Sequence, residues 1–388
     1  MLRFMRRIYL DCNASTPLAP EAAEAMRAEM ERGFGNPSST HWAGRPARTA
    51  VERSRSEVAA LLGCQPHEIV FTSGGSEANN HALKGVFFAR RGRPTQIITT
   101  AVEHPAIHAP CAFLERLGAV ITRLPVDATG RIDPDDLRRA ITPSTALISV
   151  MHANNEVGTI QPIAECARIA REHGVLFHSD AAQSVGKIPT RVDELGVDLL
   201  TLAGHKFHAP KGIGALFVRS GTVLEPLIHG AGHENGRRAG TESAVLAAGL
   251  GVAARLATDL APMRRVAELR DRFRRGLIAH FGDRVVFNGH PRDVLPNTLN
   301  VSFPGALGAQ VLAALVGVAA STGAACHSGK VELSPVLRAM GVAPEVGQGA
   351  VRFSLGRDTS VEDIDDVLGM LAQESWRPPA GSLPEERA

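Results

Sequence analysis

One lysine in a short glycine-flanked stretch has the clearest potential for covalent chemistry. Lys206 lies in the segment Leu202-Ala-Gly-His-Lys-Phe-His-Ala-Pro-Lys-Gly212, directly after an apolar run and next to a histidine. An amine is the side chain that forms a Schiff base with a carbonyl cofactor. Only five of the 42 basic residues are lysines, so few other amines compete for that role. A loop lysine is most often just a solvated charge, and the interpretation therefore depends on the motifs around it.

A glycine-rich turn offers a site for a phosphate group. The segment Phe71-Thr-Ser-Gly-Gly-Ser-Glu-Ala-Asn-Asn80 follows an apolar run and opens a helical pattern. Glycines and hydroxyls at such a turn expose backbone N–H groups to an anion, and the helix dipole adds attraction. A glycine-rich connection with a serine cap explains the same residues equally well.

Further polar side chains stand where predicted strands end. His104 follows a strand and precedes a proline, where it could stack on an aromatic ring, act as a general base, or simply cap a helix. Asp180 and Gln183 follow the strand that begins at Val175. The carboxylate could cap a helix or hold a protonated pyridine nitrogen, and the amide could then donate to a ring oxygen. Asn155 follows another strand and is expected at the same mouth.

Two motifs near the C-terminus complete the candidates. Cys326 stands in Ser321-Thr-Gly-Ala-Ala-Cys-His-Ser-Gly-Lys330, among small residues and beside a histidine, which makes it a candidate reactive thiol. Arg352 lies in an apolar strand pattern and could clamp a carboxylate through two hydrogen bonds. The glycine-rich, basic segment 230–242 is either an anion-binding loop or a flexible turn. Three other cysteines differ from Cys326 and are typical of buried apolar residues: Cys64, Cys111 and Cys166.

The composition excludes several classes of protein. The chain has 388 residues, of which 44% are hydrophobic and 21% charged, as in ordinary globular proteins, and it is long enough for two domains. A formal net charge of +2 gives no electrostatic case for nucleic acid or an anionic membrane as a partner. No apolar run approaches the roughly 20 residues that span a bilayer. The basic start of the chain lacks the apolar region of a secretory signal.

The cysteines and histidines argue against disulfides and metals. Five cysteines are an odd number, they are widely spaced, and no Cys-x-x-Cys pair occurs. We therefore expect neither a disulfide framework nor a structural zinc site. We expect the protein to be located in the cytoplasm. The 15 histidines are scattered along the chain, and we expect no metal site.

Short apolar runs alternate with helical segments between about residues 60 and 220. The runs are nearly continuous, as expected for strands that are buried on both faces. This alternation predicts an α/β fold with a mostly parallel sheet covered by helices, and ligands beyond the carboxyl ends of its strands. The predicted strands are Ile69–Phe71, Gln96–Thr99, Val120–Leu124, Leu147–Met151, Val175–His178, Leu199–Ala203 and Gly214–Val218.

A second, smaller domain is expected after this region. Helices at Ala244–Leu256 and Met263–His280 lead into it. The tail 377–388 is rich in proline and charge and is expected to be disordered. The expected elements of the second domain are Thr298–Phe303, Leu307–Leu315, Val316–Ser321, Ala350–Leu355 and the helix Val361–Leu371.

In their order along the chain, these motifs resemble those of the NifS/IscS-type pyridoxal-phosphate-dependent cysteine desulfurases, in the class-V aminotransferase superfamily. The match runs from Tyr9-Leu-Asp11 and Phe34-Gly-Asn-Pro37 to Arg352-Phe-Ser-Leu-Gly-Arg357, and it includes Arg238-Ala-Gly-Thr241. Each motif alone has modest specificity, but the ordered set is highly specific. The resemblance implies a fold-type-I transferase with a seven-stranded large domain over residues 16–258. A smaller α+β domain, from residues 1–15 and 259–376, would carry the cysteine loop.

The resemblance also implies a role for each candidate around the cofactor, pyridoxal 5'-phosphate. Lys206 would bind it covalently and later carry protons, and His104 would stack on its ring. Asp180 would pair with the pyridine nitrogen. Gln183 and Asn155 would contact the ring oxygen or the substrate.

The remaining implied roles concern the phosphate, the substrate and a partner subunit. Arg352 would take the substrate carboxylate, and Cys326 would attack the sulfur of L-cysteine, leaving L-alanine and a persulfide for acceptor proteins in iron–sulfur cluster or thio-cofactor assembly. His104 would assist with the thiol proton. The expected homodimer would bring Thr241 of one subunit to the phosphate site of the other. The phosphate contacts within one subunit are Gly75, Ser76 and His205.

Three departures from the family pattern keep alternatives open. Ala203 stands where the family often has a phosphate-binding serine, and His208-Ala209 replaces a common Tyr-Gly pair. Ala325-Cys-His-Ser328 resembles the loop of selenocysteine lyases, so L-selenocysteine is an alternative substrate. In another fold-type-I enzyme, such as an aminotransferase, Cys326 would be structural. A scaffold without activity is the last alternative, and the intact lysine, aspartate and histidine set speaks against it.

Overall fold

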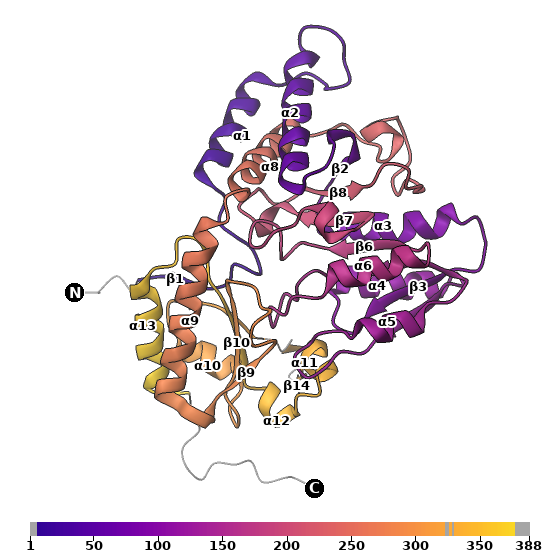
Figure 1. The fold of residues 1–388 in the computed structure, drawn as a ribbon. Helices are drawn as coiled ribbons and strands as arrows, with labels where there is room; N and C mark the ends of the chain where they lie inside the picture. The colour runs from indigo at the N-terminus through magenta and orange to yellow at the C-terminus, as the bar shows by residue number, and fades with distance from the viewer. Residues whose placement is uncertain (1–5, 323–325, 328–329, 377–388) are drawn as a thin grey trace.

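The computed structural model describes residues 6–322, 326–327 and 330–376, with the backbone alone at 326–327 and 330–331. The described residues form two units, each with its own hydrophobic core (Figure 1). The expected tail 377–388 lies outside them. Within the described chain no single helix is long and apolar enough to cross a membrane; the segments Ala244–Ala257 and Ala261–Arg284, bent by 71°, pass that test only as a pair.

The large unit is built on a seven-stranded sheet with the strand order β2-β8-β7-β6-β5-β3-β4. β8 is antiparallel to both of its neighbours, and the other neighbouring strands are parallel. Only the edge strand β4 exposes several residues, which accounts for the nearly continuous apolar runs of the others. The predicted mostly parallel α/β sheet is confirmed. The strands are β2 (Ile69–Thr72), β3 (Gln96–Thr100), β4 (Val120–Leu124), β5 (Thr145–Ser149), β6 (Leu176–Asp180), β7 (Leu199–Ala203) and β8 (Gly214–Val218).

Helices cover both faces of this sheet (Figure 1). Neighbouring strand residues point to opposite faces, so Ile97 packs in the core under α3 and α4, whereas Ile98 packs in the core under α2, α6 and α8. The helices are α1 (Pro20–Arg32), α2 (Gly44–Leu62), α3 (Gly75–Ala89), α4 (Pro105–Glu115), α5 (Pro134–Ala140), α6 (Ile163–Glu172), α7 (Val192–Leu195) and α8 (Ala244–Ala257).

The small unit has a four-stranded antiparallel sheet in the order β12-β15-β10-β9. Its core joins this sheet to α9, α10 and α13 through phenylalanines such as Phe273 and Phe353, whose rings lie edge to face 4.9 Å apart. The strands are β9 (Val286–Asn288), β10 (Thr298–Ser302), β11 (Val318–Ala319), β12 (Ser321–Thr322), β13 (Cys326–His327), β14 (Lys330–Val331) and β15 (Ala350–Ser354). The helices are α9 (Ala261–Phe281), α10 (Gly308–Ala314), α11 (Pro335–Ala339), α12 (Pro344–Gly347) and α13 (Val361–Ala372).

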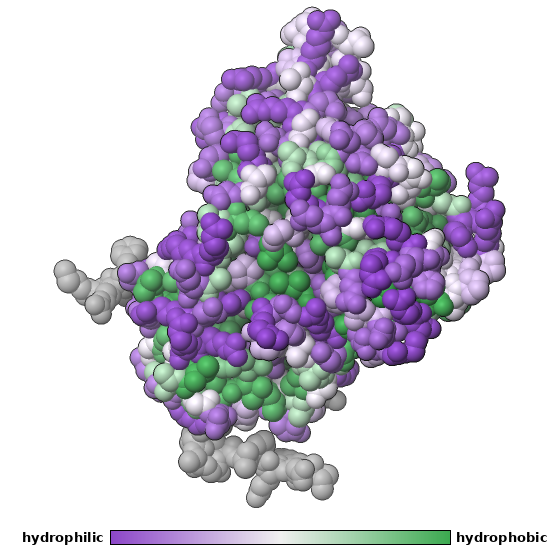
Figure 2. All heavy atoms as spheres, viewed as in Figure 1, coloured by the Kyte–Doolittle hydropathy of each residue, from purple (hydrophilic) through white to green (hydrophobic). Residues whose placement is uncertain are grey.

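The N-terminal strap, residues 8–19, connects the two units. It begins as β1 (Ile8–Tyr9), which pairs in parallel with β11 of the small unit. Farther along, the amide of Thr16 donates to the carbonyl of His205, and the amide of Ala19 donates to that of His208. Figure 2 shows hydrophobic side chains gathered near the junction of the two units, on a face that is otherwise mostly hydrophilic.

One predicted element of the small unit is divided. The expected continuous segment Val316–Ser321 forms two short strands, β11 and β12, which belong to different sheets. β11 pairs with the N-terminal strap and β12 pairs with β15, so the chain must change sheets at Ala320. The pairing partners lie far away in the sequence, and local apolar periodicity contains no signal for them.

Helix α8 approaches α2 closely at a glycine. A Cβ on Gly251 would lie 2.8 Å from the Cα and the Oγ of Ser54, whereas a Cβ on Gly369 of α13 would meet nothing within 4 Å. We expect Gly251→Ala to lower the free energy of unfolding by about 1–3 kcal/mol through overpacking. We expect Gly369→Ala to raise it by about 0.5–1 kcal/mol, because alanine favours the helix. Chemical denaturation measures the free energy of unfolding of each variant. Equal values for the two variants would contradict the close approach of α8 to α2 at Gly251.

Candidate active site

A cavity of about 430 Å³ lies at the carboxyl ends of the large sheet's strands, where ligands bind in folds of this type. It gathers nine of the predicted residues from segments that are distant in the sequence. Its polar lining comes from segments that follow β2, β3, β5, β6 and β7, from Asn13 of the N-terminal strap and from β15 of the small unit. The predicted residues in its lining are Gly75, Ser76, His104, Asn155, Asp180, Gln183, His205, Lys206 and Arg352.

Two predicted residues are not placed in this lining. Thr241 lines a separate cavity of about 210 Å³. Cys326 belongs to β13, which pairs with β14, and its side chain lies outside the described part of the structure. Among the described residues, no group of three or more His, Cys, Asp or Glu side chains is arranged to hold a metal ion.

The amine of Lys206 is held by backbone carbonyls rather than by a carboxylate. Its Nζ donates to the carbonyl of Asn13 at 2.7 Å and to that of Ala14 at 2.9 Å, both in the N-terminal strap. Burial, and after it the charge of Arg352, lowers the pKa of Lys206 to about 8, although Asp180 acts to raise it. Near pH 8, a larger share of this amine is therefore neutral than in an ordinary lysine, and the neutral amine is the nucleophile.

Asp180 ends β6 with its carboxylate fixed in place. One carboxylate oxygen accepts from Nδ2 of Asn79 at 2.7 Å, and the other accepts from the amide of Ala182 at 2.9 Å. Asn79 comes from the second turn of α3 and was not predicted. The side-chain oxygen of Asn79, Oδ1, is buried without a partner among the described residues. The hydrogen bond to Asp180 is therefore the one that orients the Asn79 side chain.

His104 has one of the roles that the sequence left open, that of a helix cap, and it also lines the cavity. It is the N-cap of α4, where its Nδ1 accepts from the amide of Ala106 at 3.1 Å, and its ring also lines the cavity. Burial, and then the charge of Lys206, lowers its pKa against the opposing effect of Asp180. The pKa of the neighbouring His205 is lowered to about 4, mainly by burial, so that this ring is neutral at pH 7.

Arg352 projects from β15 with two partners. Its Nη1 donates to the carbonyl of Asn155 at 2.9 Å, and its Nη2 donates to Oδ1 of Asp11 at 2.8 Å. Asp11 also accepts from the hydroxyl of Ser321 at 2.9 Å. Nε of Arg352 is buried without a partner in the described chain. The guanidinium is thus oriented, and it retains N–H groups for an anion.

The turn before α3 has the shape expected of an anion site. Gly74 has a φ of 149°, a conformation that favours glycine, and α3 begins at Gly75. A Cβ on Gly75 would lie 3.2 Å from Cβ of Ala203, so glycine is also needed for close packing here. The first backbone N–H groups of a helix have no partner within it and are free for a ligand.

A carboxylate close to this turn is neutralised by the segment 230–242. Glu77, in the first turn of α3, receives two hydrogen bonds from Arg238, at 2.9 and 3.3 Å, and one from the amide of Ser73. Burial acts to raise the pKa of Glu77, but the bonds from Arg238 and Ser73 outweigh it and lower the pKa overall. Thr241 follows three residues later, so this pair also anchors the segment that carries it.

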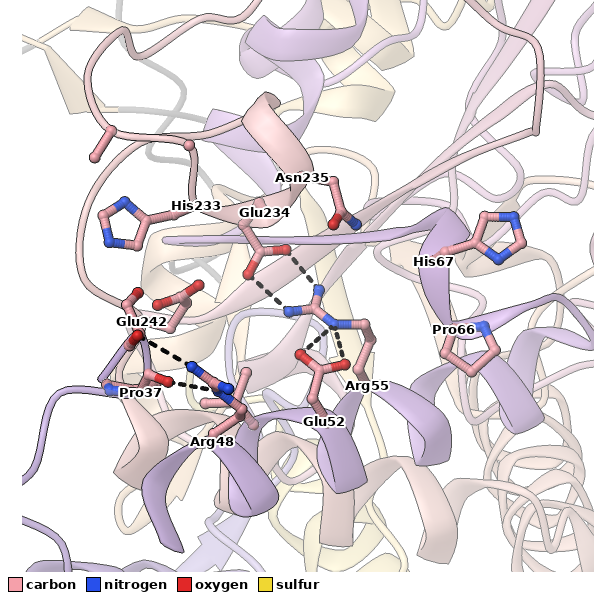
Figure 3. Close-up of a pocket in the computed structure, with 14 residues that line it drawn as sticks. Pro37, Arg48, Glu52, Arg55, Pro66, His67, His233, Glu234, Asn235 and Glu242 are labelled. Atoms are coloured by element: carbon pink, nitrogen blue, oxygen red, sulfur yellow. Dashed lines mark hydrogen bonds and ion pairs between the residues drawn. The ribbon is translucent and has the colours of Figure 1, made fainter. Parts of the chain in front are cut away.

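A second anchor of the same segment lines another cavity, of about 880 Å³, which the sequence did not predict (Figure 3). Glu234 faces Arg55 of α2 through hydrogen bonds of 2.6 and 3.0 Å, and it accepts from the amide of Phe71 at 2.9 Å. Glu234 and Asn235 adopt φ of 51° and 57°, a conformation that costs a non-glycine residue about 1–2 kcal/mol. The buried pair offsets this strain.

Sequence reasoning missed the residues that hold the lining in place. Asn13 accepts from Lys206 and also from Gln183, through its backbone carbonyl. Its side chain bonds to Lys187, which is buried beneath the cavity. A weak signal was present for Asn79, because it stands one helical turn after Gly75 and therefore on the same face of α3. The sequence held no signal for Asn13, whose role depends on a long-range contact.

The chain is similar to proteins of one family along nearly its whole length. The family model described as aminotransferase class-V matches residues 8–367. A curated relative from Dictyoglomus turgidum, named cysteine desulfurase IscS, is 49% identical over 370 residues, which cover 94% of each chain. A solved structure described as a NifS-like protein has a TM-score of 0.89 at 36% identity and covers 95% of this chain and 99% of its own. Another, described as SspA in complex with cysteine, has a TM-score of 0.81 at 38% identity, with 90% and 98% covered.

The lowered pKa of Lys206 can be measured without any cofactor. In the folded apoprotein we expect competitive acylation of this lysine to rise with pH around a half-point near 8, because the neutral amine is the reactive form. In the unfolded chain the half-point should return toward 10.5, the ordinary value. Mass spectrometry of the peptide that contains Lys206 gives both curves. Equal half-points in the folded and unfolded chains would contradict the electrostatic picture.

A buried and an exposed bidentate arginine–glutamate pair of the large unit should differ in their effect on stability. We expect Glu234→Gln to cost up to about 3–5 kcal/mol of unfolding free energy, because it removes the buried charge partner of Arg55 and leaves only the exposed Glu52, at 3.2 Å. The matched control is Glu115→Gln, which breaks the exposed pair with Arg123 and should cost no more than about 1 kcal/mol. Denaturation measures both costs, and limited proteolysis should cut the segment 230–242 faster only in the first variant. Similar costs in the two variants would refute the anchoring role of Glu234.

Proposed function

The chain belongs to the class-V aminotransferase family, and from that membership we propose that it is a cysteine desulfurase that uses pyridoxal 5'-phosphate. The observation that carries the proposal is the placement of Lys206, Asp180 and Arg352 around one cavity. An amine, a carboxylate and a guanidinium are the groups that a carbonyl cofactor with a pyridine ring and an amino-acid substrate require. The product would be L-alanine, with the sulfur left on the enzyme.

The residues of the cavity fit this cofactor in chemistry and in space. Gly74 and Gly75 give the turn before α3 a conformation and a packing distance that favour glycine, and the helix N-terminus there suits a phosphate. Ser76 and His205 would add contacts from the same side. The carboxylate of Asp180, oriented by Asn79, would hold the proton of the pyridine nitrogen. When bound, pyridoxal phosphate supplies an electron sink for the negative charge that builds on the substrate carbon framework.

The protein groups then divide the work of the reaction. Lys206 binds the cofactor and afterwards moves protons at its Nζ, a task that suits an amine with a pKa near 8. Arg352 orients the substrate through its carboxylate, with Asn155 alongside. His104 would stack on the ring of the cofactor, and Gln183 would contact its ring oxygen. His104 also assists in removing the proton from the attacking thiol.

Cys326 would perform the sulfur transfer. Its thiolate attacks the sulfur of the substrate, so a sulfur–sulfur bond forms while the substrate's carbon–sulfur bond breaks. The electron pair of the broken bond stays with carbon, which is then protonated to give alanine. The product on the enzyme is a persulfide, whose outer sulfur passes to acceptor proteins for iron–sulfur cluster or thio-cofactor assembly.

The wider setting of the enzyme is also part of the proposal. In a homodimer, Thr241 of one subunit would reach the phosphate site of the other, which accounts for its placement outside the cavity of its own chain. A reactive cysteine must stay reduced between turnovers, and this favours the cytoplasm. The loop sequence around Cys326 favours one second candidate, a selenocysteine lyase that releases alanine from L-selenocysteine.

The deciding measurement is alanine release from L-cysteine and L-selenocysteine, run in parallel with cofactor-loaded protein and a reductant. We expect turnover of both substrates, with cysteine well used. Turnover of selenocysteine alone would replace the desulfurase by the lyase. No alanine from either substrate would reject both and favour another enzyme of the fold, such as an aminotransferase.

Two variants assign the chemistry to residues. We expect Lys206→Ala to remove the visible absorbance of the bound cofactor and to lower turnover by at least about 10²–10⁴-fold, since it removes both the anchoring amine and the proton carrier. Cys326→Ala should keep the absorbance but lose alanine formation from cysteine. If the cysteine variant made alanine at the normal rate, the persulfide role would be wrong.

A further inference from the structure

A second lysine lies buried directly beneath the candidate active site. Lys187 follows the turn after β6, and only 7% of its surface is exposed. Its Nζ donates to Oδ1 of Asn13 at 3.0 Å and to Oε1 of Gln183 at 2.8 Å. No ion pair among the described residues includes Lys187. Lysines are almost never this buried without a carboxylate partner, so its presence here calls for a reason other than ion pairing.

The donor character of Lys187 fixes the orientation of the Gln183 amide. The amine of Lys187 lies against Oε1 of Gln183, and in its protonated form it can only donate, so the oxygen of the amide must then face Lys187. The nitrogen then points the other way, and Nε2 of Gln183 donates to the carbonyl of Asn13 at 2.9 Å. The flipped amide would place two donors against each other on one side and two acceptors on the other. Lys187 and the strap carbonyl thus select the same orientation.

Asn13 is oriented by the same amine. Its Oδ1 accepts from Lys187 and from Nδ2 of Asn297, at 3.0 Å each. Its Nδ2 is therefore free to donate to Oγ1 of Thr298 at 2.8 Å and to the carbonyl of Asn155 at 3.2 Å. The backbone carbonyl of Asn13 remains the acceptor for Lys206. One buried amine thus controls two residues of the cavity lining.

We propose that Lys187 is a positioning residue, which holds the amide nitrogen of Gln183 toward the ring oxygen of the cofactor and Asn13 toward the amine of Lys206. The inference rests on the proposed function, because it assigns Gln183 as a donor to that oxygen. It adds a residue that lies outside the cavity lining and acts through two residues of that lining, Gln183 and Asn13.

The electrostatic cost of this lysine supports the inference. Burial, and after it the charge of Lys206, lowers the pKa of Lys187 to about 7, with Arg352 adding to the effect and Cys12 opposing it. The unfolded chain would bind a proton on this amine up to a pH near 10.5, so the folded state loses stability between about pH 10.5 and 7 as pH falls. An apolar residue of similar length would avoid that loss, yet the chain keeps an amine here.

The test is the pH titration of the visible absorbance of cofactor-loaded protein. A hydrogen bond to the ring oxygen stabilises its anion, so losing the fixed donor should raise the midpoint of the titration. We expect Lys187→Met to raise it by about one pH unit and to speed cofactor release about tenfold. The control is Lys84→Met, whose amine lies over the ring of Phe113 away from the cavity, and which should change neither quantity.

A double-variant cycle separates positioning from general loosening of the fold. In a Gln183→Ala background the donor is already gone, so adding Lys187→Met should produce no further shift of the midpoint. A full additional shift in that background would overturn the inference, and so would an unchanged midpoint in folded Lys187→Met.

If Lys187→Met does not fold, Lys187→Gln decides in its place. Its amide can both donate and accept, so it no longer forces the orientation of Gln183. A midpoint shifted in the same direction supports the inference, and a wild-type midpoint overturns it. Failure of the proposed function looks different, because the unsubstituted protein would then gain no visible absorbance with pyridoxal phosphate at all.

Discussion

Lys206 extends from the end of β7 and donates its hydrogen bonds to carbonyls of the N-terminal strap, 193 and 192 residues away. The strap is held by both units, because β1 pairs with β11 and the amide of Thr16 bonds to the turn that carries the lysine. Arg352 reaches the same strap at Asp11. The amine belongs to the large unit and the guanidinium to the small one, so this extended segment links the two groups, alongside the direct bond from Arg352 to the carbonyl of Asn155. A cofactor anchored at one group and a substrate held by the other would both depend on this segment.

The segment 230–242 shows a similar dependence on long-range contacts. The two residues that anchor it contact both ends of the turn before α3. Glu234 accepts a hydrogen bond from the amide of Phe71 in β2, and Arg238 donates to Glu77 at the start of α3. The shape of the turn and the placement of the segment are therefore coupled. Left-handed residues raise the conformational free energy of a loop. A buried bidentate ion pair stabilises the fold only where both partners have all their hydrogen bonds. Their combination here leaves the loop few alternative conformations.

The sequence was most informative where chemistry and local pattern coincide. Lys206, Asp180 and His104 stand at strand ends beside turns, and their convergence follows from the rule that parallel strands present their carboxyl ends at one edge. The residues that orient them were not predictable in this way. Asn13 acts through contacts with Lys187 and Asn297, which no local periodicity connects. The same limit applied to the division of Val316–Ser321 between two sheets, because pairing partners are a property of the whole fold. Local sequence thus specified the reactive groups, and long-range packing specified their geometry.

The choice of acceptors explains how two buried lysines remain useful. A carboxylate next to either amine would favour its protonated form and raise its pKa, whereas a carbonyl or amide oxygen positions the amine with much less stabilisation of the charge. Lys206 donates to backbone carbonyls and Lys187 donates to side-chain amide oxygens, and their pKa values fall to about 8 and about 7. The two carboxylates nearby are engaged elsewhere, Asp180 with Asn79 and Asp11 with Arg352. The site therefore keeps two acidic groups close to the amines without pairing them, which leaves the amine of Lys206 free to react and that of Lys187 free to orient its neighbours.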